Sequence, residues 1–166
     1  MELLRHSMSR EINRLLWAMG CTVSAAESCS AGRIATYLTL PAGSSSYFRG
    51  SMVCYANDLK VSLLGVDKKV IETNSAVCEE VARQMVTGAL QLFHTDYALA
   101  MTGFAGPTGG TPDNPLGTIW VAVGNKNRSV TKKVYHKLGR EMNTIIATAQ
   151  LLRMFLDFLI EDAGNQ

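Results

Sequence analysis

Three polar segments, each following an apolar run typical of a β-strand, carry side chains suited to chemistry. Residues 26–32 read Ala-Glu-Ser-Cys-Ser-Ala-Gly, residues 55–60 read Tyr-Ala-Asn-Asp-Leu-Lys, and residues 102–110 read Thr-Gly-Phe-Ala-Gly-Pro-Thr-Gly-Gly. The ligand site of an open α/β sheet lies where strand ends meet, so we expect the three segments to converge and form a site.

Ser28 is the candidate nucleophile, because it lies where a helix start would offer free N–H groups to an anion or an oxyanion. A serine hydroxyl also needs a neighbouring base. The usual base is histidine, but His6, His94 and His136 all lie outside the three segments. A lysine that burial deprives of its charge is the remaining option, and Lys60 is the best candidate.

Two features of the other segments have more than one interpretation. Tyr55 either relays a proton or anchors a substrate by its hydroxyl, or it is a half-buried core residue. The glycine-rich segment 103–110 is either an anion-binding loop or a structural connection. It lacks the Gly-Lys-Ser/Thr ending of a P-loop, which disfavours nucleotide triphosphate hydrolysis. We expect no metal, since no acidic or histidine cluster has ligand spacing.

Composition limits the classes of protein. The 166 residues suit a single domain over 1–166, and the net charge of +2 argues against a nucleic-acid surface. The basic stretch 126–137 is interpreted as solvated strand positions. No apolar run approaches the ~20 residues of a membrane span. The four cysteines have no zinc-type spacing and predict reduced thiols in the cytoplasm, with Cys21 and Cys54 buried and Cys29 assigned to packing.

Hydrophobic periodicity predicts the elements that position these segments. We expect helices before Gly20, over 30–40, from an N-cap at Asn57, over 79–93 and over 141–161. Strands are predicted over 21–26, 48–55, 97–102, 117–123 and 129–135, the last two forming a hairpin around 124–127. Helices interspersed with strands indicate a single three-layer α/β/α domain with a mixed β-sheet.

The last predicted helix carries more apolar residues than one face needs. They are Leu151, Leu152, Phe155, Leu156, Phe158 and Leu159. Either the helix is deeply buried within the subunit or it also supplies a contact between copies. We expect a homo-oligomer, a dimer or larger.

The three segments together resemble the CinA C-terminal domain family, whose stand-alone members include bacterial nicotinamide mononucleotide deamidases. Segment 26–32 is similar to the family's Ala-Glu-Ser-Cys-Thr-Gly-Gly, 55–60 to Tyr-Ser-Asn-x-x-Lys, and 103–110 to Gly-Ile-Ala-Gly-Pro-x-Gly-Gly. Residues 41–45 resemble its Gly-Ser-Ser segment, and 115–118 its Pro-Val-Gly-Thr. The resemblance covers most of the chain.

The resemblance implies an amidohydrolase that converts nicotinamide mononucleotide to nicotinate mononucleotide and ammonia in pyridine-nucleotide recycling, without metal or cofactor. Ser28 would attack the carboxamide, Lys60 would be the general base, and Tyr55 would assist proton transfer. Arg140 would hold the substrate phosphate, unless it is merely a surface arginine. The other implied substrate-binding residues are Ser30, Ala31, Gly32, Ser44, Ser45, Gly103, Ala105, Gly106, Gly109 and Gly110.

Three departures from the family pattern keep alternatives open. Ala31 replaces a glycine, Thr108 stands where many relatives have an acidic residue, and Thr144-Ile145 where many have basic residues. The alternatives are a non-catalytic nucleotide-binding or partner protein of the same fold, and an amidohydrolase acting on another amide-bearing nucleotide.

Overall fold

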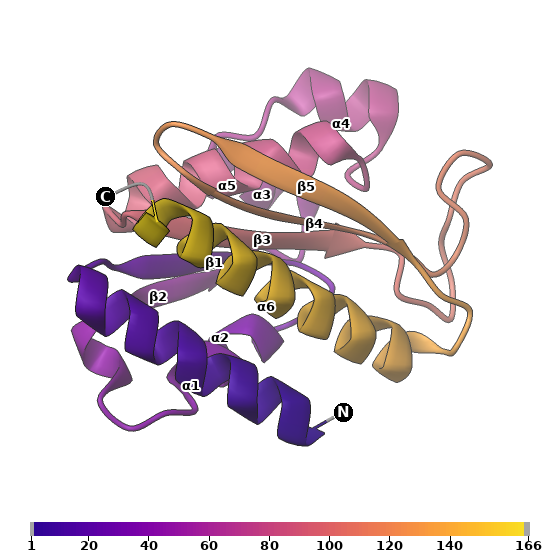
Figure 1. Cartoon of the computed structure of the whole chain (residues 1–166). Coiled ribbons are helices and arrows are strands. Elements are labelled where there is room, and N and C mark those ends of the chain that lie inside the picture. Colours follow the sequence, from indigo (N-terminus) through magenta and orange to yellow (C-terminus); the bar gives the residue numbers. More distant parts are fainter. Residues whose placement is uncertain (1, 165–166) are drawn as a thin grey trace.

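The computed structural model describes residues 2–164, with side chains from residue 6 onward (Figure 1). In this range five strands form one mixed sheet in the order β2-β1-β3-β4-β5. Strands β2 and β3 run parallel to β1 on either side of it, whereas β4 is antiparallel to β3 and β5 to β4. The strands are β1 (Val23–Glu27), β2 (Phe48–Val53), β3 (Tyr97–Gly103), β4 (Thr118–Asn125) and β5 (Ser129–Tyr135).

Helices cover both faces of the sheet, which confirms the predicted three-layer α/β/α architecture. Figure 1 shows one layer made by α1 (Glu2–Met19), α2 (Arg33–Thr39) and α6 (Arg140–Gly164). The opposite layer contains α3 (Asn57–Leu64), α4 (Lys68–Asn74) and α5 (Glu79–Phe93). A short 3-10 helix, η1 (Ser44–Ser46), precedes β2.

The strands β1 and β3 are buried and mostly apolar because both of their faces are covered. All five residues of β1 are buried, as are the first six of β3. Leu99 and Met101 of β3 belong to the cluster under α1 and α6, whereas Ala98 and Ala100 belong to the cluster under α5. Small residues on the α5 side let that helix lie close to the sheet.

A close approach between α5 and α3 fixes the segment that carries Lys60. A Cβ atom added at Gly88 of α5 would lie 2.1 Å from the carbonyl oxygen of Leu64, the last residue of α3. Only glycine fits at this contact, so the end of α3 rests directly on the backbone of α5.

The apolar surplus of α6 is accounted for by burial within the chain. The helix is long and apolar enough to cross a membrane by length and composition, but all six apolar residues noted above are buried in the core. Such burial is the first of the two interpretations given for this helix, and a homo-oligomer stays a prediction.

The element bounds differ from the predicted ones where local backbone geometry intervenes. Helix α2 begins at Arg33, not residue 30, because Ala31 (φ 50°) and Gly32 (φ 95°) adopt left-handed conformations that end the preceding turn. Helix α4 was not predicted. None of its seven residues is buried, so it has no periodic apolar face to reveal it.

The left-handed conformation of Ala31 predicts a stabilising substitution. Replacing Ala31 by glycine should raise the free energy of unfolding by about 1 kcal/mol, because a Cβ is unfavourable at positive φ. Ala35→Gly, the same chemical change inside α2, should lower it by about 1 kcal/mol. Urea unfolding of both variants measures the pair, and equal destabilisation would contradict the assigned backbone conformation.

Candidate active site

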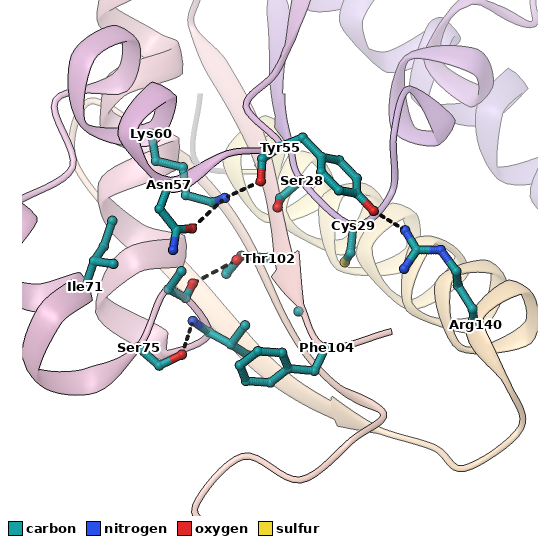
Figure 2. Close-up of a pocket in the computed structure, with 13 residues that line it drawn as sticks. Ser28, Cys29, Tyr55, Asn57, Lys60, Ile71, Ser75, Thr102, Phe104 and Arg140 are labelled. Atoms are coloured by element: carbon teal, nitrogen blue, oxygen red, sulfur yellow. Dashed lines mark hydrogen bonds between the residues drawn. The ribbon is translucent and has the colours of Figure 1, made fainter. Parts of the chain in front are cut away.

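The three polar segments meet at the carboxyl ends of β1, β2 and β3. Glu27, the last residue of β1, pairs with Val53 of β2 and with Met101 of β3. Between β1 and β3 the sheet changes the direction in which the chain winds, and such a switch point opens a crevice. A pocket of about 280 Å³ lies there, lined by residues of all three segments and of α6 (Figure 2).

Ser28 directly follows β1 at this crevice. Its backbone N–H donates to Met101 O at 3.1 Å, so the residue is held by the neighbouring strand. The side chain is 8% exposed and lines the pocket. Its hydroxyl makes no hydrogen bond to any residue in the described part of the chain, so it can be engaged by a ligand.

Lys60 brings a buried amine to the same pocket. The residue is only 1% exposed, and its Nζ donates to Cys54 O at 3.0 Å, Tyr55 O at 3.4 Å and Asn57 Oδ1 at 3.4 Å. Burial lowers the pKa of Lys60 below its ordinary value, although any negative charge on Cys54 or Cys29 would act in the opposite direction. Figure 2 shows the amine directed toward the side of the pocket where the Ser28 hydroxyl lies.

Asn57 has a different role from the predicted N-cap. The N-cap of α3 is Ala56, and no side chain caps the helix. The Asn57 amide oxygen instead accepts from the Lys60 ammonium one turn later. The segment is thus organised around the lysine and not around the helix start.

Tyr55 and Arg140 form one wall of the pocket together. The Tyr55 hydroxyl accepts a hydrogen bond from the Arg140 guanidinium, which also donates to Gly106 O at 3.0 Å. Tyr55 is 56% exposed, so it is not the half-buried core residue of one interpretation. Its hydroxyl points to Arg140 while only its carbonyl contacts Lys60, so the structure does not show a proton relay between the two side chains (Figure 2).

A buried carboxylate that the sequence analysis missed holds the turn around Ser28. Glu27 is fully buried, and its two oxygens accept from the amides of Gly32 (2.8 Å), Ile34 (3.1 Å) and Ala35 (2.9 Å) and from Ser51 Oγ (2.9 Å). The amide donors at the start of α2 are therefore occupied. The Gly32 amide is thus bonded to Glu27 and Gly32 does not line the pocket, so its predicted role in substrate binding stays a prediction.

The amides of the turn itself remain available. Within the described residues, neither Cys29 nor Ser30 donates its backbone N–H to another backbone group. Both lie next to Ser28, where an oxyanion formed at that residue would need donors. The Ser30 hydroxyl is buried and makes no hydrogen bond in the described structure, and neither Ser30 nor Ala31 lines the pocket.

Cys29 lies beside Ser28 but is held in its unreactive form. Burial raises the pKa of the Cys29 thiol to about 12, although the positive charge of Arg140 opposes the shift. The thiolate is the nucleophilic form of cysteine, and it is scarce near neutral pH at such a pKa. Ser28 is thus the better nucleophile of the two.

The glycines of segment 103–110 serve packing more than anion binding. A Cβ at Gly103 would lie 2.6 Å from Ile119 Cγ1, and one at Gly110 would lie 2.7 Å from Leu116 N. Ala105 is buried, and its carbonyl accepts from Asn143 of α6. Gly103 lines the pocket, whereas Ala105 and Gly106 line a neighbouring cavity beside Arg140, and Gly109 and Gly110 line neither.

Ser44 and Ser45 lie at the amino ends of the parallel strands, opposite to the carboxyl ends where the pocket lies. They belong to η1, which enters β2 at its amino end, where Tyr47 O accepts from the first residue of β1. Helix α2 returns the chain from the carboxyl end of β1 to the amino end of β2. A single chain therefore does not bring these two serines to the pocket, contrary to the prediction.

The wall opposite Lys60 combines residues of segment 102–110 with residues that the sequence analysis did not assign to the site. It contains Ser75, Ala76, Val77, Thr102 and Phe104. Thr102 Oγ1 donates to Ala76 O at 2.8 Å, and Val77 N donates to Ser75 Oγ at 3.2 Å, so the wall is tied together. The motif containing Phe104 was visible in the sequence, but nothing in it indicated which way the ring points.

Among the described residues, no group of three or more His, Cys, Asp or Glu side chains lies close enough together to hold a metal ion. The three histidines do not line the pocket.

Comparison with known proteins identifies the family. A model of the CinA C-terminal domain matches residues 5–159. The chain belongs to the CinA C-terminal domain family. The match includes every residue of the pocket described above.

Solved CinA structures share the whole fold. The competence/damage inducible protein CihA from Agrobacterium tumefaciens is 34% identical, with a TM-score of 0.89 over 93% of this chain and 94% of that chain. The competence damage-inducible protein A (ComA) from Klebsiella pneumoniae is 29% identical, with a TM-score of 0.90 over 94% of this chain and 97% of that chain.

Curated CinA relatives are longer proteins. A CinA-like protein of Shewanella piezotolerans is 39% identical over 97% of this chain, which spans 39% of that protein. A CinA-like protein of Mycobacterium tuberculosis is 44% identical over 81% of this chain, and the match spans 32% of that protein. The chain thus corresponds to well under half the length of these two relatives.

The three departures noted in the sequence analysis, at Ala31, Thr108 and Thr144-Ile145, lie outside the pocket. Ala31 and Thr108 are exposed, and neither lines the pocket. Thr144 is buried within α6, where its hydroxyl donates to Arg140 O and Glu141 O. These positions therefore leave the contacts of Ser28 and Lys60 unchanged.

The hydrogen bonds of the Glu27 carboxylate predict that exchanging a single one of its oxygen atoms will strongly lower the free energy of unfolding. Glu27→Gln replaces an acceptor oxygen by an NH₂ group that faces backbone donors, so we expect a loss of about 2–4 kcal/mol in the free energy of unfolding. Ser51→Ala removes only one of the four donors and should cost about 1 kcal/mol. Urea unfolding compares them, and a smaller loss in Glu27→Gln would refute the network.

The lowered pKa of Lys60 predicts a pH-dependent stability. Between that pKa and about 10.4, the ordinary value, the unfolded chain binds more protons than the native one, so stability rises with pH through this window. The stability advantage of Lys60→Met over the wild type should therefore be largest at the low end and shrink as the pH rises. Unfolding curves measured across the window check this.

Lys132→Met serves as the control for that series. Lys132 is exposed on β5, so its ammonium is hydrated in both the folded and the unfolded chain. A Lys60→Met advantage that stays constant with pH, as expected of the control, would exclude a lowered pKa for Lys60.

Proposed function

We propose that this chain is a nicotinamide-nucleotide amidohydrolase, which deamidates nicotinamide mononucleotide to nicotinate mononucleotide and ammonia in the pyridine-nucleotide recycling of the cytoplasm. The observation that carries the proposal is the pairing of a buried serine hydroxyl and a buried lysine in one pocket at the switch point of the sheet. A serine and a lysine of lowered pKa form a known type of nucleophile and base.

The first half-reaction transfers the acyl group to the enzyme. The Ser28 hydroxyl, which has no hydrogen-bond partner among the described residues, attacks the carboxamide carbon. The neutral Lys60 amine takes the proton of this hydroxyl. The lowered pKa of Lys60 makes the neutral amine available at a lower pH than in a free lysine. The amides of Cys29 and Ser30 stabilise the oxyanion. Lys60 then gives the proton to the departing nitrogen, which leaves as ammonia.

The second half-reaction reuses the same base. A water molecule attacks the ester carbon of the acyl-enzyme, and Lys60 accepts one of its protons. Collapse of the intermediate breaks the bond to Ser28 Oγ, and Lys60 returns the proton to that oxygen. The product is nicotinate mononucleotide, and neither half-reaction requires a metal or an organic cofactor.

Arg140 is the group best placed to orient the substrate. Its guanidinium lines the pocket and is held by Gly106 O and the Tyr55 hydroxyl, which leaves part of the N–H fork for a ligand. Tyr55 then acts by fixing Arg140. We assign the substrate phosphate to Arg140 on this basis.

Ammonia release from nicotinamide mononucleotide by the purified protein tests the proposal. Ser28→Ala and Lys60→Ala should each lower kcat by about 10³-fold or more, because one removes the nucleophile and the other the base. Cys29→Ala, a substitution at the neighbouring buried residue, should retain activity and serves as the matched control.

Other outcomes would point elsewhere. Turnover that survives in Ser28→Ala but is lost in folded Cys29→Ala would transfer the nucleophile to the thiol. Binding of the mononucleotide by the wild type without ammonia release would favour a non-catalytic nucleotide-binding protein. Release only from a different amide-bearing nucleotide would change the substrate and keep the chemistry.

A further inference from the structure

The ring of Phe104 forms a fixed wall of the pocket. Its backbone N–H donates to Thr118 O at 2.8 Å, and its carbonyl accepts from Gly117 N at 2.7 Å, so both backbone groups are bonded at the start of β4. Figure 2 shows the ring next to Ser75 and across the pocket from Ser28 and Lys60.

Gly109 supports the ring from behind. A Cβ added at Gly109 would lie only 3.0 Å from Phe104 Cδ1, so the loop backbone rests against the edge of the ring. The ring is therefore held between the loop and the pocket. The similar family motif given in the sequence analysis has isoleucine at this position.

The charges of the pocket restrict what the wall can bind. Among the described residues, the only charged side chains that line it are those of Lys60 and Arg140, both basic, and no carboxylate faces the cavity. The ring of nicotinamide mononucleotide is a pyridinium, which carries a positive charge. With no carboxylate to pair with it, the negative face of an aromatic ring is the attractive partner that remains.

Tyr55 is less able to provide this partner. The Arg140 guanidinium carbon already lies 6.0 Å from the centre of the Tyr55 ring, so that face is next to a cation. Phe104 has no such neighbour among the cations that line the pocket in the described structure.

We propose that Phe104 stacks on the pyridinium ring of the substrate and makes this chain selective for the charged, planar ring over the uncharged dihydropyridine ring of the reduced mononucleotide. The inference rests on the proposed amidohydrolase function and adds the residue that selects the ring. The bound ring also affects Lys60, because its positive charge favours the neutral form of the nearby amine.

The test compares Phe104→Ile, which restores the family residue, with Phe104→Tyr, which keeps the aromatic face. Ammonia release is measured with nicotinamide mononucleotide and with its reduced form. Phe104→Ile should raise the KM for the oxidised substrate on the order of tenfold, with a smaller change in kcat and in the KM for the reduced form. Phe104→Tyr should retain the wild-type KM and the wild-type preference.

Binding of nicotinate mononucleotide, measured by calorimetry, gives a readout that does not depend on turnover. This product keeps the pyridinium ring, so its affinity should fall with Phe104→Ile and not with Phe104→Tyr. Thermal unfolding checks that each variant is folded, and Phe104→Leu replaces Phe104→Ile if the branched side chain prevents folding.

The two proposals fail in different ways. A wild type that neither turns over nor binds either mononucleotide overturns both. Wild-type turnover with unchanged KM and preference in Phe104→Ile overturns the stacking role and leaves the amidohydrolase standing. An equal loss in Phe104→Tyr and Phe104→Ile would show that the ring matters only through its packing on Gly109, which also overturns the role.

Discussion

The Glu27 carboxylate is the interaction on which the geometry of the pocket depends. Four donors from the start of α2 and from β2 converge on its two oxygens, and the residue is fully buried at the end of β1. The carboxyl group is stable there because each of its two oxygens accepts two hydrogen bonds, which compensate for its burial. The same bonds turn the chain sharply after β1, and Ser28 is the first residue of that turn. The position of Ser28 thus follows from the need to satisfy a buried carboxyl group.

Close backbone contacts fix the other segments that line the pocket. Gly88 allows the backbone of α5 to contact the end of α3 behind Lys60, and Gly103 allows the end of β3 to pack against Ile119 of β4. Because glycine has no side chain, two segments can come into direct contact at each of these positions. A rigid frame of this kind holds in place the acceptors to which the Lys60 amine and the Arg140 guanidinium donate.

The sequence predicted those features that local patterns control. Apolar runs identified the central strands, and the apolar side of residues 79–93 identified α5, because burial imposes a period on each. The convergence of the segments containing Ser28 and Lys60 followed from the rule for parallel strand ends. Other features depend on the path of the folded backbone, which no pattern of residue types encodes. The acceptor role of Glu27 needs the left-handed backbone at Ala31, the displacement of Ser44 needs the path of α2, and the direction of the Phe104 ring needs the position of Gly109.

The pocket draws its walls from nearly the whole length of the chain. Ser28 follows the first strand, Phe104 follows the third, and Arg140 begins the last helix, whose bond to Tyr55 joins residues 85 positions apart. Because α6 packs on both α1 and β4, Arg140 reaches Tyr55 only after the last helix has docked. A nascent chain that still lacks this helix can form the turn around Ser28 without closing the cavity. The proposed amidohydrolase activity would therefore require the last helix to be in place, and a partly synthesised chain would lack it.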